Sequence, residues 1–253
     1  MSSDIWNACG CSIVFENLNG ILFRSVLVES YVALATDRLI TNLDEYSVLE
    51  ELLEKSKPLL PDDTSFLHNL LGTPFRYPPL LHGSRFGQCH EASLFYGSLS
   101  IETVLFESAY YRFLFWQGMT VPPMDPIHAD HTLFSADYSC TRGIKLHQPP
   151  FNAWQADLTD RCSYTVSQTL GSAMRSAGVE AFKFTSARDI NNGVNVALFT
   201  PSAFVNFSPS ISQSWISETT AGSVVFYCRD DGSRHEFDLA TFLVDSILPM
   251  PAV

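Results

Sequence analysis

The chain has 253 residues, of which 46% are hydrophobic, and a formal net charge of -12. This apolar content suits one sizeable core, and no linker, repeat or charge block divides the sequence, so we expect a single domain over residues 1–253. Only 15 Lys and Arg are scattered along the chain, which argues against direct nucleic-acid binding, and no stretch approaches the ~20 apolar residues that a membrane span requires.

The amino terminus lacks a basic segment followed by an apolar run, so no secretory signal is visible. The six cysteines are widely separated, and we expect a cytoplasmic protein with reduced thiols. Cys9 and Cys11 have no second pair nearby to complete a zinc site, and His128 and His131 lack a third ligand at a usual spacing. We therefore expect no bound metal.

The first quarter of the chain predicts one strand and two helical segments. Residues 20–28 are typical of a strand and place Arg24 at its middle. Apolar side chains recur at helical spacing over residues 44–57, where Pro58 ends the pattern, and a short helical piece is expected at 67–71.

The next segments lead into the most informative part of the sequence. Prolines favour an extended segment over residues 73–79. A glycine-flanked loop follows at 83–87, and a short apolar run predicts a strand that ends at 94–98. A helix is expected from Ser100 to about Phe115, with the Ser100 hydroxyl capping its first turn.

The second half of the chain predicts short strands around one helix. Residues 117–155 are rich in Pro and His and favour irregular structure crossed by a strand at 131–135. An amphipathic helix is expected at 164–177, closed by Gly178. Apolar runs at 181–184 and 194–199 predict two antiparallel strands, because the residues between them, 189–193, have turn chemistry.

The carboxyl-terminal part predicts three further strands, at 214–219, 223–229 and 235–239. An Asp-Gly turn at Asp231 and Gly232 joins the last two as a β-hairpin. Many short strands with few helices indicate an α+β fold, with helices flanking a mainly antiparallel central sheet.

A cation, a phenol and a carboxylate follow one another at intervals of eleven residues, as Arg85, Tyr96 and Glu107. Because a loop, a strand and a helix deliver them, the three can converge on one cleft. Ser186 adds a hydroxyl after the strand at 181–184. This combination suits an anionic, aromatic ligand that contains ribose, and NAD fits that description best.

Each of these residues has a chemical role and an ordinary alternative. A fixed Glu107 carboxylate would stabilise the oxocarbenium-like transition state of nicotinamide–ribose cleavage, but a solvent-facing glutamate is common. Arg85 would bind phosphate through two parallel hydrogen bonds, or form a surface salt bridge. Tyr96 would stack on nicotinamide or lie in the core, and Ser186 would serve the ligand or only a turn.

Several nucleotide and hydrolase signatures are missing from the sequence. There is no Gly-x-Gly-x-x-Gly and no Walker loop, so NAD would not bind through a Rossmann unit. There is also no Gly-x-Ser-x-Gly, which leaves a serine hydrolase without its nucleophile motif.

The ordered motifs resemble the RES-domain family, which is named for an Arg, a Glu and a Ser. The likeness runs from about residue 20 to residue 238. The motifs that carry it are Thr73-Pro74-Phe75-Arg76-Tyr77, Gly83-Ser84-Arg85-Phe86, Leu94-Phe95-Tyr96-Gly97-Ser98, Glu102 through Glu107, Phe184-Thr185-Ser186-Ala187-Arg188 and Ala197-Leu198-Phe199-Thr200-Pro201.

The resemblance implies an ADP-ribosyltransferase-like fold, with a family core at about 20–205 and a C-terminal β-hairpin extension at about 206–253. It implies that NAD is consumed as a substrate and that no separate cofactor is needed. By motif, the catalytic residues and the NAD contacts fall on the following positions. The catalytic set is Arg85, Tyr96, Glu107 and Ser186, and the NAD-binding set is Arg24, Arg85, Phe86, Tyr96 and Ser186.

Family members are typically toxins of type II toxin–antitoxin pairs, neutralised by an antitoxin with an Xre-like domain. The resemblance therefore implies a toxin that degrades NAD, as a glycohydrolase or as a phosphorylase with inorganic phosphate as co-substrate. Three alternatives remain open at this point. They are ADP-ribosylation of a host protein, a catalytically silent binding module, and a secreted effector with an immunity partner.

Overall fold

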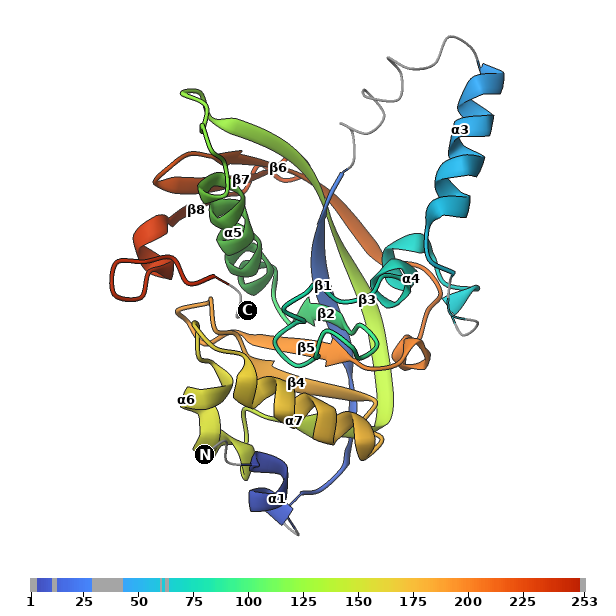
Figure 1. Cartoon of the computed structure of the whole chain (residues 1–253), viewed down its shortest axis with the longest axis vertical. Helices are drawn as coiled ribbons and strands as arrows, with labels where there is room; N and C mark the ends of the chain where they lie inside the picture. Colours follow the sequence, from blue (N-terminus) through green and yellow to red (C-terminus); the bar gives the residue numbers. More distant parts are fainter. Residues whose placement is uncertain (1–3, 11–12, 29–42, 60, 62–63, 251–253) are drawn as a thin grey trace.

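The computed structural model describes residues 4–10, 13–28, 43–59, 61 and 64–250, and it confirms the expected α+β class (Figure 1). Within these residues the strands are β1 (Glu16–Leu27), β2 (Phe95–Ser98), β3 (Ile127–Lys145), β4 (Ala181–Thr185), β5 (Val194–Leu198), β6 (Ile211–Thr219), β7 (Ser223–Cys228) and β8 (Arg234–Asp238). The α-helices are α1 (Ile5–Cys9), α3 (Leu43–Ser56), α4 (Asn69–Arg76), α5 (Ile101–Gln117), α6 (Gln155–Leu158) and α7 (Thr165–Ser176). Short 3-10 helices are η3 (Phe151–Trp154), η4 (Pro201–Ala203) and η5 (Leu239–Phe242).

Strand β3 organises the sheet, whose order is β1-β2-β5-β4-β3-β6-β7-β8 with an additional β1–β3 pairing. One edge of β3 pairs with β1, from Glu16 opposite Gly143 to Leu27 opposite His131. Its first half also pairs with β6, and its last residues pair with β4. Among these pairings only β3–β4 is parallel, so the sheet is mainly antiparallel as expected.

Because β1 pairs with both β2 and β3, the strands β1, β2, β5, β4 and β3 close on themselves, while β6 to β8 continue away from β3. Figure 1 shows this division, with α5 beside β6 to β8 and α7 beside β4. One apolar cluster fills the space between α5 and strands β6 to β8, and another lies under α7 and β4. The residues at the start of α5 therefore lie where the two parts of the sheet meet.

Each predicted strand and helix overlaps an observed one, although the helical piece expected at 67–71 begins only at Asn69. The expected strand at 20–28 begins earlier, at Glu16, and the helix from Ser100 is capped by that hydroxyl, which accepts the Thr103 amide at 3.2 Å. The Asp-Gly turn joins β7 to β8 with Gly232 at φ +75°.

The extended segment predicted at 73–79 is wrong in its first half, because residues up to Arg76 belong to α4. Pro74 lies inside this helix and removes one backbone hydrogen bond. The helix persists because Leu71 is fully buried and Phe75 packs on the rings of Phe95 and Phe204. Tertiary packing thus overrides the local effect of the proline.

The irregular segment predicted at 117–155 is wrong in its middle, where β3 extends over 19 residues. The strand expected at 131–135 lies within β3 but is much shorter, because polar residues interrupt the apolar alternation on both sides of it. Its hydrogen bonds are supplied by three partner strands, and their pairing, not local propensity, fixes the extended backbone.

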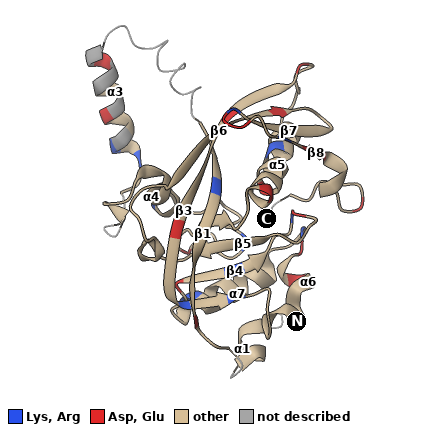
Figure 2. Cartoon of the chain, turned by 180° about the vertical axis from the view of Figure 1, so that it is seen from behind, with Lys and Arg blue, Asp and Glu red and all other residues tan. Residues whose placement is uncertain are grey.

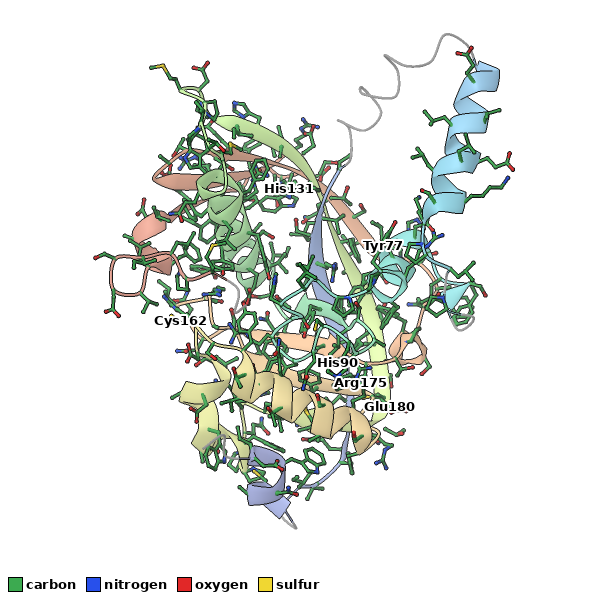
Figure 3. All side chains as sticks on the ribbon, in the orientation of Figure 1. Tyr77, His90, His131, Cys162, Arg175 and Glu180 are labelled. Carbon is green, nitrogen blue, oxygen red and sulfur yellow. The ribbon has the colours of Figure 1, made fainter. Side chains whose placement is uncertain are left out.

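His131 lies within β3, in the part of the molecule that contains α5 (Figure 3). Its Nε2 lies 2.8 Å from the Ser217 hydroxyl, and burial lowers the pKa of its imidazole to about 4. Within the described ranges, no three His, Cys, Asp or Glu side chains gather into a group that could hold a metal ion. No helix of the described part of the chain is long and apolar enough to cross a membrane. Figure 2 shows the acidic and basic residues dispersed over the elements.

Candidate active site

A cleft of about 500 Å³ opens where the Arg85 loop, β1, β2 and the first turns of α5 meet. Four of the predicted residues line it, namely Arg24, Arg85, Tyr96 and Glu107. Residues 96, 85 and 107 come from a strand, a loop and a helix, as the sequence predicted. Ser186 and Phe86 do not line the cleft.

The Glu107 carboxylate is half-buried and held by two neutral donors. Its Oε1 accepts hydrogen bonds from the Ser186 hydroxyl at 2.6 Å and from the Asn195 side-chain amide at 2.7 Å. No donor among the described residues bonds to Oε2, and no described cation lies within ion-pair distance. The carboxylate is therefore fixed in place without being neutralised. The alternative that Glu107 simply faces solvent does not apply.

Ser186 contacts Glu107 and does not reach the cleft itself. Its side chain is 3% exposed, and its Oγ accepts the backbone amides of Arg188 at 3.1 Å and Asp189 at 3.0 Å while donating to Glu107. The turn role expected for this serine is thus present, and the same hydroxyl also contacts Glu107. Its predicted direct contact with NAD is not offered by this geometry, so we treat Ser186 as a positioning residue.

Asn195 is a member of the site that the sequence reasoning missed. It is the second residue of β5 and is 5% exposed. Its Oδ1 accepts the Ser98 hydroxyl at 2.6 Å, which fixes the amide so that Nδ2 points its hydrogens at Glu107. A polar residue inside the apolar run Val194-Asn195-Val196-Ala197-Leu198 was the available signal, because a buried amide requires partners.

The loop that carries Arg85 is a tight turn in which Ser84 and Gly87 form an isolated bridge. Gly83 has φ +70°, and a Cβ there would lie 2.3 Å from the Gly87 carbonyl oxygen. The glycines therefore serve the turn itself. The Arg85 guanidinium donates to the Asp160 carbonyl at 2.8 Å and lies 4.5 Å from the centroid of the Tyr164 ring.

Tyr96 holds this loop against β2. Its hydroxyl lies 2.9 Å from the Ser84 hydroxyl and accepts the Phe86 amide at 3.1 Å, so it bonds the residues on both sides of Arg85. Burial raises the pKa of Tyr96 to about 12, and the phenol is neutral at physiological pH. The hydrogen-bonding capacity of its hydroxyl is thus used within the protein, as expected if Tyr96 were a core residue. The side chain nevertheless lines the cleft.

Phe86 does not stack on a ligand in this geometry, contrary to the expectation for an NAD contact. Its side chain is fully buried, and its ring packs edge-on against Phe182 at 4.9 Å and Phe184 at 4.8 Å. The backbone conformation of the loop turns Arg85 toward the cleft and the next side chain into the core. Phe86 anchors the loop.

Two further arginines share the cleft with Arg85. Arg24 donates from Nη1 to the Tyr96 carbonyl at 2.7 Å and lies 4.8 Å from the centroid of the Phe95 ring. Burial lowers the pKa of its guanidinium to about 10, which leaves it charged at neutral pH. The third is Arg188, which was not predicted as a site residue although it ends the motif at 184–188. Its guanidinium lies 3.6 Å from the centroid of the Tyr110 ring.

The three cleft arginines share one property. Within the described residues none of them pairs with a carboxylate, and they donate to carbonyl or phenol oxygens and stack on rings. The surface salt bridge considered for Arg85 is therefore not formed. The site presents fixed cations and one fixed carboxylate within the same cleft.

Comparison with known proteins places these motifs in a family. No curated protein matches the chain. Among solved structures, a chain of the M. tuberculosis MbcT–MbcA toxin–antitoxin complex is 12% identical, over 63% of this chain and 73% of that one, with a TM-score of 0.38. A TM-score of that size does not establish a common fold. The model of the RES domain matches residues 63–216, which include Arg85, Tyr96, Glu107 and Ser186, and the chain belongs to the RES domain family.

Proposed function

We propose that the protein degrades NAD⁺ by cleaving the bond between nicotinamide and ribose. Transfer to water would give nicotinamide, ADP-ribose and a proton, and transfer to inorganic phosphate would give nicotinamide and a phosphorylated ADP-ribose. The residues themselves support this proposal, and membership of the RES domain family agrees with it.

The observation that carries the proposal is the restrained carboxylate of Glu107 in a cleft with arginines, none of which forms an ion pair with a described residue. Loss of nicotinamide leaves positive charge on the ribose, and a carboxylate fixed beforehand stabilises that charge without having to reorient. Arginine is suited to the pyrophosphate, since its planar fork matches phosphate oxygens. Arg24 and Arg85 would bind the phosphates, and Ser186 and Asn195 would keep Glu107 in place.

The biological setting follows from the same chemistry. An enzyme that consumes NAD in the cytoplasm would deplete the cellular pool and arrest growth, so we propose a toxin. From the resemblance to the RES-domain family, we further propose that a cognate antitoxin of the Xre-like type holds it inactive. Co-expression with the product of a neighbouring gene would restore growth if that product is the antitoxin.

The test is to incubate the purified protein with NAD⁺, with and without inorganic phosphate, and to identify the products by chromatography and mass spectrometry. We expect free nicotinamide in both cases, and the second product distinguishes hydrolysis from phosphorolysis. Nicotinamide release that occurs only when a target protein is added, with a mass increase of that protein, would replace NAD degradation by ADP-ribosylation.

Induced expression in cells provides an independent measurement. Cellular NAD should fall before growth stops, and a Glu107→Gln variant expressed at the same level should change neither. No nicotinamide release by the wild-type protein, together with unchanged NAD in cells, would overturn the proposed activity and leave a binding module as the better description.

A further inference from the structure

Arg188 is a cation that the protein encloses but does not neutralise. Its side chain lines the cleft and is only 2% exposed. No carboxylate of the described residues lies within ion-pair distance of its guanidinium. Keeping a charge out of water without a counter-ion is costly, so an isolated buried arginine beside a cleft calls for an anionic partner.

The present hydrogen bonds of Arg188 are weak for a charged donor. Its Nη2 donates to the Arg161 carbonyl and to the Tyr164 hydroxyl, both at 3.3 Å and both neutral. Its Nη1 has no acceptor in the part of the chain that the structure describes. Charge-assisted hydrogen bonds are shorter, at about 2.7–2.9 Å. The guanidinium therefore keeps unused capacity for an oxyanion.

Tyr164 links Arg188 to Arg85. The Arg85 guanidinium lies over the face of the Tyr164 ring, and the hydroxyl of the same ring accepts from Arg188. All three side chains line the cleft. Two cations thus flank one phenol, on the side of the cleft where a group with several charged oxygens would find donors from both.

We propose that Arg188 and Arg85 form an anion subsite that takes a phosphate group, whose oxygen would replace the Tyr164 hydroxyl as the acceptor for Arg188. The source of the phosphate rests on the proposed function, and it is either the dinucleotide itself or inorganic phosphate that accepts the ribosyl group. The existence of the subsite is testable without any turnover.

The experiment measures binding of inorganic pyrophosphate and of inorganic phosphate to the full chain by calorimetry, without NAD and at constant ionic strength. The wild-type protein should bind at least one of them. Arg188→Gln should weaken that binding by about tenfold to a hundredfold, the loss expected for one charge-assisted hydrogen bond. Arg188→Lys should lose less, because it keeps the charge but not the planar fork.

Arg175 provides a matched control. Its guanidinium lies 4.7 Å from the centroid of the Phe199 ring, donates to the Ala92 carbonyl at 2.6 Å and leaves Nε without a partner among the described residues. It lies on α7 and does not line the cleft (Figure 3). Arg175→Gln should therefore keep wild-type anion affinity. If Arg188→Gln does not fold, as judged by its thermal transition, the anion affinity of Arg188→Lys is compared with that of the wild-type protein instead.

Repeating the phosphate titration with saturating ADP-ribose identifies the source. Competition means that the subsite holds the phosphates of the dinucleotide, and simultaneous binding means that it holds the acceptor. Equal anion affinities of wild-type and Arg188→Gln proteins would overturn the subsite, as would a wild-type protein that binds neither anion. Absence of NAD turnover with anion binding intact would instead count against the proposed function alone.

Discussion

Glu107 accepts hydrogen bonds from the Ser186 hydroxyl and the Asn195 amide, whereas the arginines of the same cleft donate to carbonyl and phenol oxygens and rest on aromatic rings. The negative Glu107 and the positive arginines are thus held in one cleft by neutral partners only. An ion pair between Glu107 and an arginine would neutralise both charges within the protein. Because none forms among the described residues, each set remains available to a ligand with an anionic end and an end that becomes positive during reaction.

The two sets also differ in what their positioning depends on. The carboxylate depends on side chains of the turn after β4 and of β5, which are nearly inaccessible to solvent. The Arg85 loop depends on the Tyr96 phenol and on the Gln168 amide, which donates to the Ser84 carbonyl at 3.0 Å. It also depends on close backbone packing, because a Cβ at Gly171 would lie 1.9 Å from the Phe86 carbonyl oxygen. Substitutions on the two sides should consequently change different kinetic constants.

The largest effect is expected for Glu107→Gln, which keeps the size of the side chain and removes its charge. Turnover of NAD should fall by about 100-fold or more, on the scale of losing one preorganised electrostatic group. Folding should be retained. The matched control is Glu102→Gln, on the exposed side of the same helix, which should turn over normally. The measurement is kcat for NAD turnover by both variants in steady-state kinetics. A wild-type kcat for Glu107→Gln would contradict the role assigned to this carboxylate.

The next largest effect is expected for Arg85→Ala. Removing the guanidinium takes away charge-assisted hydrogen bonds to phosphate, so KM for NAD should rise by about tenfold to a hundredfold while kcat changes less. Arg175→Gln again serves as the control. A fall in kcat at unchanged KM would mean that Arg85, like Glu107, stabilises the transition state. It would contradict the distinction between a carboxylate that sets kcat and an arginine that sets KM.

The sequence predicted much of this site, and the reasons for its success and its limits are physical. Arg85, Tyr96 and Glu107 could be predicted to share a cleft because a loop, a strand and a helix follow one another without insertion. What each side chain does there could not be predicted. The buried ring of Phe86 and the double role of Ser186 depend on loop dihedral angles that the sequence does not reveal.

The members of the site that were missed come from distant parts of the chain. Asn195 reaches Glu107 only because β5 pairs between β2 and β4, and Tyr164 reaches the arginines from the segment before α7. The full length of β3 was missed for the same reason, since only residues 131–135 were expected as a strand and its pairing partners lie far away in sequence. Local patterns show the elements, and long-range pairing determines which polar residues meet.

Asn195→Asp tests the neutral character of the donors to Glu107. The substitution would place a second carboxylate at hydrogen-bonding distance from the first, where the original amide lies 2.7 Å from Oε1. Like charges raise the pKa of such a pair, so the acidic limb of the kcat/KM profile should move to higher pH and activity at neutral pH should fall by about tenfold. Asn195→Ala should lower activity without moving that limb. An unmoved limb in Asn195→Asp would show that Glu107 does not control it.

The smallest effect is expected for Tyr96→Phe, which removes the hydroxyl that secures both sides of Arg85. The Phe86 amide and the Ser84 hydroxyl would lose their partner, so the free energy of unfolding should fall by about 1–3 kcal/mol. KM for NAD should rise less than in Arg85→Ala, because the guanidinium itself remains. Tyr227→Phe, on the exposed surface of β7, is the control and should change neither quantity.

The same variant carries a pH signature. Burial raises the pKa of Tyr96 from 10.0 to about 12, so the folded state resists ionisation of the phenol more than the unfolded state does. The stability linked to this shift is complete below the unfolded pKa and is lost as pH rises from about 10 toward 12. Tyr96→Phe should therefore lose less stability over that interval than the wild-type protein, as measured by denaturant unfolding at the two ends of the range. Parallel losses in both proteins would mean that burial does not raise the pKa of the Tyr96 phenol on folding.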